Sequence, residues 1–161
     1  MLVSSPIQRK MMQENAHTQP KKEAITFDDL GLKKEILQSV KDAGFTIPSP
    51  IQAAAIPFIL QGRDIVGQAH TGTGKTAAFG LPALNNIDPR NGVGILVITP
   101  TRELATQVSD ELFKYGRNIG ARTVTVYGGS SYNRQIDLIQ RGASVVVATP
   151  GRLLDILKKN L

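Results

Sequence analysis

The segment Ala69–Thr76, with the sequence AHTGTGKT, has the residue types and spacing of a loop that holds phosphate groups. Gly72 and Gly74 let the backbone bend and approach an anion closely, because glycine has no Cβ. The backbone N–H groups in this loop can then point at phosphate oxygens, and a helix that follows adds its positive N-terminal end. The ammonium group of Lys75 would reach the outer phosphates, and the hydroxyl of Thr76 would hold Mg²⁺. The segment predicts a nucleotide site, for ATP above all, with an ordinary glycine turn as the alternative.

Two other segments share the order Thr-Pro-x-Arg, at Thr99–Arg102 and at Thr149–Arg152. Threonine can cap a helix and proline suits its first position, so each segment would present free N–H groups beside an arginine. Such an arrangement binds phosphate, and two of them on one edge of a sheet could follow successive phosphates of one strand. Gly128 and Gly129 lie between the two segments, where they let a backbone approach a ligand or simply turn the chain. Capping without any ligand stays the alternative for both threonine sites.

The hydrophobic pattern predicts the elements that position these segments. A helix that ends at Gly44 and a short apolar helix after Pro50 come first, and alternating strands and helices follow. Strands are predicted at Asp64–Gln68, Gly94–Thr99, Arg122–Tyr127 and Ser144–Thr149, and helices at Lys75–Leu84, Arg102–Gly116, Ser131–Gln140 and Arg152–Lys159. This alternation predicts an α/β fold with a parallel sheet covered by helices on both faces. Ligands of such sheets bind at the carboxyl ends of the strands, where all the segments described above lie.

Composition and charge limit the function classes. The 161 residues suit one domain, and 19 Lys and Arg against 13 Asp and Glu give a net charge of +6. That charge suits a nucleic acid, or is only a generic basic surface. The absence of cysteine excludes disulfides and thiolate metal sites and fits a cytoplasmic location, and no apolar run is long enough to span a membrane. Residues 1–24 are predicted to be a disordered basic tail, and 25–161 to be the folded part.

Taken together, these segments resemble the DEAD-box family of ATP-dependent RNA helicases. The matching segments, in matching order and spacing, are GFTIPSPIQ at Gly44–Gln52, AHTGTGKT, PTRELA at Pro100–Ala105, the pair Gly128-Gly129, and TPGR at Thr149–Arg152. The resemblance runs from about Phe27 to the end of the chain. A phosphate loop alone would not separate helicases from kinases or GTPases, but the combination does.

The resemblance implies a P-loop NTPase with a RecA-like sheet, ATP and Mg²⁺ as cofactors, and single-stranded or duplex RNA as partner. Its implied catalytic residues are Lys75 and Thr76, with Thr76 as the metal ligand. The ATP-binding residues that it implies are Phe27, Gln52, Ala69, His70, Thr71, Gly72, Thr73, Gly74, Lys75 and Thr76. The RNA-binding residues that it implies, through contacts with the RNA backbone, are Pro100, Thr101, Arg102, Gly128, Gly129, Thr149, Pro150, Gly151 and Arg152.

Two of these roles concern adenine. The side-chain amide of Gln52 can pair with the N6 donor and N7 acceptor of adenine, whereas guanine reverses the polarity at the 6-position, so ATP is expected over GTP. Phe27 lies 17 residues before Gly44, where the family has an aromatic residue that stacks on adenine. Without the resemblance, Phe27 would be interpreted as a core residue and Gln52 as a surface residue of a helix. RNA is expected over DNA, because contacts to the 2′-hydroxyl distinguish them.

The family's Asp-Glu-Ala-Asp and Ser-Ala-Thr motifs do not occur in these 161 residues, nor does a second RecA-like domain with its arginine fingers. We therefore expect a chain truncated before the acidic motif, which binds nucleotide weakly and does not hydrolyse it usefully. We also expect either a rearranged sheet or an incomplete one, because the strands with the missing motifs lie between the phosphate-loop strand and the others. The alternatives are another P-loop enzyme such as a small-molecule kinase, a DNA helicase, and a non-catalytic nucleotide- or RNA-binding fragment.

Overall fold

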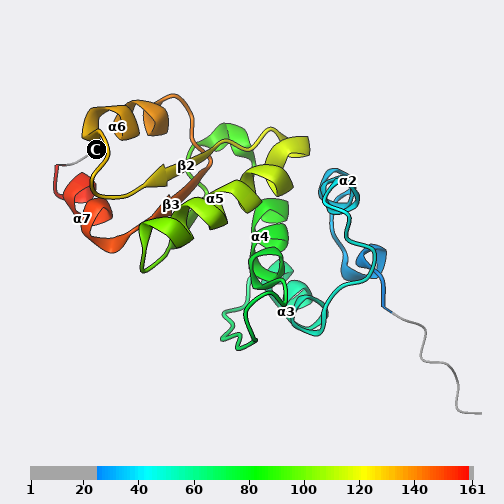
Figure 1. Ribbon diagram of the computed structural model, residues 1–161. Coiled ribbons are helices and arrows are strands. Elements are labelled where there is room, and N and C mark those ends of the chain that lie inside the picture. The colour runs from blue at the N-terminus through cyan, green and yellow to red at the C-terminus, as the bar shows by residue number, and fades with distance from the viewer. Residues whose placement is uncertain (1–24, 160–161) are drawn as a thin grey trace, which may run out of the picture.

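The computed structural model describes residues 25–159, so the predicted tail at 1–24 lies outside the described part of the chain. Four helical elements come first in the described residues: η1 (Phe27–Leu30), α2 (Lys34–Asp42), α3 (Pro50–Leu60) and α4 (Lys75–Asn86). After the short turn η2 (Pro89–Asn91), strands and helices alternate: β1 (Ile95–Ile98), α5 (Arg102–Gly116), η3 (Arg117–Ile119), β2 (Thr123–Val126), α6 (Tyr132–Gln140), β3 (Val145–Ala148) and α7 (Pro150–Lys158). The predicted α/β alternation is therefore confirmed, and Figure 1 shows α6 and α7 on one side of the strands and α5 on the other.

The sheet has three parallel strands in the order β1-β3-β2. Ile95 of β1 and Thr123 of β2 both lie opposite Val145, the first residue of β3. All four residues of β3 are buried, because β3 is the central strand and both of its faces are covered. This strand is the VVVA run that the sequence predicts to be buried.

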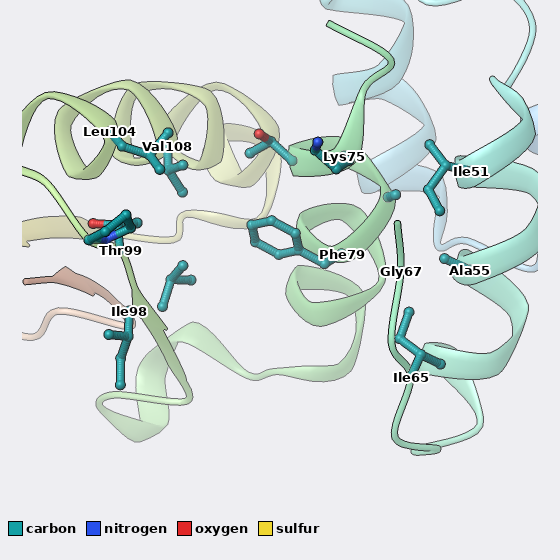
Figure 2. Close-up of a pocket in the computed structure, with 14 residues that line it drawn as sticks. Ile51, Ala55, Ile65, Gly67, Lys75, Phe79, Ile98, Thr99, Leu104 and Val108 are labelled. Atoms are coloured by element: carbon teal, nitrogen blue, oxygen red, sulfur yellow. The ribbon is translucent and has the colours of Figure 1, made fainter. Parts of the chain in front are cut away.

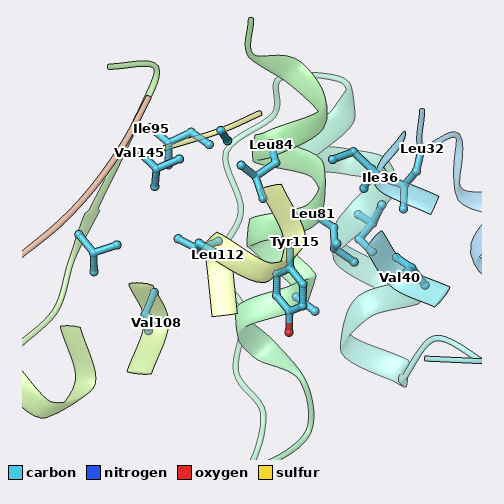
Figure 3. Close-up of a cluster of buried hydrophobic side chains, with 14 of the residues drawn as sticks. Leu32, Ile36, Val40, Leu81, Leu84, Ile95, Val108, Leu112, Tyr115 and Val145 are labelled. Carbon is cyan, nitrogen blue, oxygen red and sulfur yellow. The ribbon is translucent and has the colours of Figure 1, made fainter. Parts of the chain in front are cut away.

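Two apolar clusters cover the two faces of the sheet. The larger cluster joins Ile95, Val145 and Val147 to α5, α4, α2 and η1, with Leu112, Leu84 and Ile36 fully or almost fully buried (Figure 3). The smaller cluster joins Val124, Val126, Val146 and Ala148 to Ile156 of α7, with partly buried residues of α6 and α7 packed against it. The alternation of strand side chains between faces divides the valines between the two clusters.

The strand predicted at Asp64–Gln68 does not form. The segment is exposed and has no ladder partner among the described residues, and Val66 is fully exposed. A strand needs a neighbour for its backbone groups, and a cavity of about 420 Å³ lies between this segment and β1 (Figure 2). Ile98 of β1 lines the cavity and is 57% exposed, and Leu96 of the same strand is 50% exposed. The incomplete sheet expected from the sequence is therefore observed, with the gap beside β1.

Among the described residues, no helix has the length and apolar character that crossing a membrane requires.

A nucleotide-type loop and a glycine turn at one edge of the sheet

The phosphate-type loop ends at the start of α4, as the sequence predicts. Gly72 and Gly74 have φ values of 82° and 83°, a left-handed conformation that glycine adopts without strain. Gly74 is the N-cap residue, so α4 begins at Lys75 and directs its free N–H groups toward the loop. In this structure the loop is closed on itself, because Lys75 Nζ donates to the carbonyl of Ala69 and Thr73 Oγ1 donates to the carbonyl of His70 over 2.7 Å. A bound phosphate would replace the Ala69 carbonyl as the partner of the lysine.

Gln52 is buried, with 3% of its surface exposed, so its interpretation as a surface helix residue is wrong. Its Oε1 accepts from the backbone N–H of Ser49 over 2.9 Å, and its Nε2 donates to the carbonyl of Gly74 over 3.2 Å. Ser49 also donates from its hydroxyl to the carbonyl of Thr73 over 2.8 Å. The first turn of α3 is thereby fixed to the last residues of the phosphate loop, and the amide that is expected to read adenine is oriented by the loop itself.

Phe27 occupies a core position. Its side chain is 4% exposed, and its ring stacks on that of Phe45 with 6.1 Å between centroids and 23° between planes. Phe45 in turn lies 6.1 Å from the ring of Tyr115, whose hydroxyl pKa is raised by burial and by the neighbouring Glu111. The 3-10 turn of Phe27 is fixed by Asp29, whose carboxylate accepts from the Thr26 N–H over 2.8 Å; this bond lowers the pKa of Asp29. The core interpretation of Phe27 fits the structure, and its role in stacking on adenine stays a prediction.

The two Thr-Pro-x-Arg segments do not share one design, which corrects the prediction. Thr101, not Thr99, caps α5, because its Oγ1 accepts from the N–H of Leu104 over 3.2 Å and the helix begins at Arg102. Thr99 is 4% exposed and its hydroxyl lies against the carbonyl of Ala148 in β3, so it belongs to the sheet. In the second segment Thr149 is the N-cap residue, as predicted, although its side chain makes no cap hydrogen bond.

Pro100 and Pro150 also occupy different positions relative to the helices that follow them. Pro150 is the first residue of α7, as predicted, whereas Pro100 lies two residues before α5. The loop after β1 is longer than the one after β3, so the free N–H groups of α5 lie further from the strand end than the sequence pattern indicates.

Both arginines of these segments lie at the turn that contains the glycine pair. The guanidinium of Arg102 lies over the ring of Tyr127 at 5.4 Å, and Arg152 Nη1 donates to the carbonyl of Ser130 over 3.1 Å. Gly129 has a φ of 83°, which turns the chain between these two contacts. Arg102 is exposed, whereas Arg152 is half-buried. The fold thus brings together three segments that are distant in sequence.

Gln135 of α6 is a buried residue that contacts this turn and that the sequence motifs do not include. It is 4% exposed, its Nε2 donates to the carbonyl of Tyr127 over 3.0 Å, and its Oε1 accepts from Arg152 over 3.1 Å. A signal was present in the sequence, because Gln135 lies in the apolar stripe of α6 with Tyr132, Ile136 and Ile139. A polar residue in such a stripe indicates a buried hydrogen-bonding role.

The carboxyl ends of all three strands lie beside these segments, at one edge of the sheet. The cavity next to β1 is lined at this edge by Lys75, Thr76, Thr99 and Pro100 (Figure 2), so the start of α4 and the end of β1 face the same space. Among residues 25–159, no group of three or more histidine, aspartate or glutamate side chains could hold a metal ion. This edge therefore combines the glycine-containing loop at the start of α4 with a turn that arginine side chains contact.

A family model described as DEAD/DEAH box helicase matches residues 49–161. The chain belongs to this family. It is 59% identical over 133 residues to the DEAD-box ATP-dependent RNA helicase RhpA of Helicobacter pylori strain B128. This alignment covers 83% of this chain and 27% of that protein. It is 52% identical over 136 residues to the helicase CshA of Streptococcus pneumoniae strain TIGR4, covering 84% of this chain and 26% of that protein.

Solved structures of DEAD-box proteins have the same fold. A DEAD box protein from Methanococcus jannaschii matches with a TM-score of 0.80 at 39% identity, over 84% of this chain and 37% of that one. A hypothetical ATP-dependent RNA helicase from Sulfolobus tokodaii matches with a TM-score of 0.71 at 42% identity, over 80% and 37% of the two chains. The RecA-like α/β fold predicted from the sequence is therefore confirmed. The chain spans about a quarter of the length of the curated DEAD-box relatives.

Proposed function

We propose that this chain is the ATP- and RNA-binding part of an ATP-dependent RNA helicase. The relatives at 52–59% identity are named as such helicases. The observation that carries the proposal is the hydrogen bond from Gln52 to the carbonyl of Gly74, because it joins an adenine-selecting amide to a phosphate loop. The division into a tail at 1–24 and a domain at 25–161 stays a prediction, as does the cytoplasmic location expected from the lack of cysteine.

ATP binds along the loop Ala69–Thr76. The phosphates lie over the free N–H groups at the start of α4, and Lys75 exchanges its bond to the Ala69 carbonyl for one to phosphate oxygen. The amide of Gln52 pairs with the N6 and N7 positions of adenine, which favours ATP over GTP. Phe27 is proposed to contact the adenine ring from the core cluster.

Thr76, at the start of α4, would supply one hydroxyl oxygen to a Mg²⁺ ion bound together with the nucleotide. Among the described residues, no group of three or more histidine, aspartate or glutamate side chains could hold a metal ion. These residues fit a cation that takes most of its ligands from phosphate and water, as Mg²⁺ does. The ion would neutralise charge on the phosphates, while Lys75 and the backbone N–H groups fix their position.

RNA binds at the turn of Gly128 and Gly129 and at the starts of α5 and α7. The exposed Arg102 contributes a direct ion pair to a phosphate, whereas Arg152, bonded to Ser130 and Gln135, acts mainly by holding the turn. Backbone contacts of this kind position a strand without reading its bases. Contacts to the 2′-hydroxyl select RNA over DNA.

Strand separation needs parts that these 161 residues do not contain. The Asp-Glu-Ala-Asp motif and a second RecA-like domain would position the attacking water and stabilise the charge of the transition state. We expect the 161 residues by themselves to bind ATP weakly and to lack RNA-stimulated ATPase activity. The turn that Arg102 and Arg152 contact gives no support to the alternative function of a small-molecule kinase.

The test is nucleotide binding with and without RNA. The 161-residue chain is titrated with fluorescent ATP and GTP analogues, alone and with poly(U) RNA or the matching DNA. ATP is expected to bind more tightly than GTP, and RNA to bind more tightly than DNA. Equal binding of ATP and GTP would contradict the role of Gln52, and RNA-stimulated hydrolysis at the rate of a full-length relative would contradict the expected inactivity.

A further inference from the structure

We propose that Gln135 is a positioning residue for RNA binding, which orients the peptides of the turn Tyr127–Ser131 from their buried side. The inference rests on the proposed function, because it concerns how the same turn meets the RNA backbone. Gln135 lies outside the DEAD-box segments of the sequence, and its side chain is buried beneath the turn.

Gln135 controls both ends of the glycine pair through hydrogen bonds. Directly, its Nε2 donates to the carbonyl of Tyr127 over 3.0 Å, immediately before Gly128. Indirectly, its Oε1 accepts from Arg152 Nη1 over 3.1 Å, and the same nitrogen donates to the carbonyl of Ser130 over 3.1 Å. One buried amide thus fixes the carbonyl on each side of the two glycines.

Fixing these carbonyls also fixes N–H groups, because a peptide bond is planar and trans and its C=O and N–H point in opposite directions. No described peptide bond is cis. When Gln135 holds the Tyr127 carbonyl toward the interior, the N–H of Gly128 must point away from Gln135. Likewise the bond from Arg152 to the Ser130 carbonyl turns the N–H of Ser131 away from Arg152. Gly128, Gly129 and Ser131 are exposed, so this side is open to a ligand.

A turn with its N–H groups held outward suits the binding of the anionic RNA backbone. A backbone N–H that is held outward binds a phosphate oxygen without an ordering cost at the moment of binding. The glycines let the phosphate approach closely, but they also make the turn flexible, since glycine has more accessible conformations than any other residue. Gln135 removes that flexibility while leaving the outer surface of the turn free for RNA.

The test uses Gln135→Met, which keeps the side-chain length but removes both hydrogen-bonding groups. The full 161-residue chain is titrated with labelled oligouridine of about ten nucleotides, the size of a typical single-strand site. We expect RNA affinity to fall about tenfold, as for the loss of a well-oriented hydrogen bond. Gln140→Met is the matched control, because Gln140 is exposed on the same helix, and its affinity should stay that of the wild type. ATP binding by both variants should be unchanged, which shows that the fold is intact.

Two further measurements separate positioning from a general structural role. Gln135→Met and Arg152→Ala should be non-additive in RNA affinity because they act on the same turn, whereas Gln135→Met and Gln140→Met should add. In the protein without RNA, nitrogen relaxation of the Gly128 and Gly129 amides should show a more mobile turn in Gln135→Met and not in Gln140→Met.

The outcomes distinguish the two proposals. Wild-type RNA affinity in Gln135→Met, or unchanged relaxation of the two glycine amides, would overturn the positioning role while leaving RNA binding intact. A wild-type chain that binds no RNA at all would overturn the proposed function and the positioning role with it.

Discussion

Gln52 Nε2 donates to the carbonyl of Gly74 over 3.2 Å, and Gln52 Oε1 accepts from the N–H of Ser49 over 2.9 Å. One buried amide therefore links the first turn of α3 to the N-cap of α4. The amide proposed to select the base and the loop proposed to hold the phosphates are therefore joined by hydrogen bonds in the structure without a ligand. A substitution at Gln52 or at Gly74 should consequently affect the binding of both the base and the phosphates.

Gln52→Ala should weaken ATP binding by about ten- to a hundredfold, because it removes the adenine partner and leaves the Ser49 N–H and the Gly74 carbonyl without it. The preference for ATP over GTP should also disappear. Titrations with fluorescent ATP and GTP analogues measure both effects. Gln61→Ala, at an exposed glutamine just after α3, is the control and should change neither. If Gln52→Ala still discriminates against GTP, another group reads the base.

Gly74→Ala should disturb the site more than Gly72→Ala does. Both residues have φ near 82°, so alanine costs roughly 1 kcal/mol in either place. Only at Gly74 would the new Cβ collide with Gln52 Nε2, whereas the space around Gly72 is open. We expect Gly74→Ala to lower the free energy of unfolding further and to displace the amide. Thermal unfolding and ATP titration of the two variants check this. Equal effects in both would show that the contact between residue 74 and the Gln52 amide does not limit the substitution.

Arg102→Ala and Arg152→Ala should differ, although both belong to Thr-Pro-x-Arg segments. Arg102→Ala should weaken RNA binding and lower the slope of log affinity against log salt by about one, as for one lost phosphate contact, with little change in stability. Arg152→Ala should weaken RNA binding and also lower the free energy of unfolding by about 1–3 kcal/mol, because Gln135 is left buried without its partner. Salt titrations and denaturant unfolding separate the two. Identical profiles would mean that Arg152 also binds phosphate directly.

Phe27→Leu and Phe45→Leu test whether Phe27 has a role beyond the core. Both rings belong to one stacked pair, so each change should cost about 1–3 kcal/mol of stability. If Phe27 contacts adenine, only Phe27→Leu should also weaken ATP binding, and it should do so without changing affinity for inorganic triphosphate. Equal ATP affinities in the two variants would show that Phe27 acts only as a core residue.

The pKa of Asp29 gives a local pH prediction. The N–H of Thr26 holds the Asp29 pKa below its ordinary value of 3.8, so the ionised carboxylate stabilises the fold around η1. This contribution is fully present above pH 3.8 and is lost as the pH falls through the lowered pKa. Asp29→Asn should remove the pH dependence of that contribution, which is small because the carboxylate is exposed. Stability curves between neutral pH and about pH 2 should converge for wild type and variant at the acid end.

The sequence by itself determined the elements whose signals are local. Glycines in the loop Ala69–Thr76, apolar runs such as VVVA and the helix patterns depend on neighbours within a few residues, so their order and most of their bounds follow from the residues. The location of the site at the carboxyl ends of the strands also follows, because parallel strands all end at the same edge.

Only the tertiary structure decided which of these residues meet, since contacts between distant segments leave no local signal. Asp64–Gln68 has the composition of a strand, but a strand exists only with a neighbour, and a cavity separates it from β1. Thr99 and Thr149 have the same local sequence, yet Thr99 bonds to the sheet and Thr101 caps α5. Gln52 and Gln135 became the central polar residues because packing buried their amides, and a buried amide must find partners.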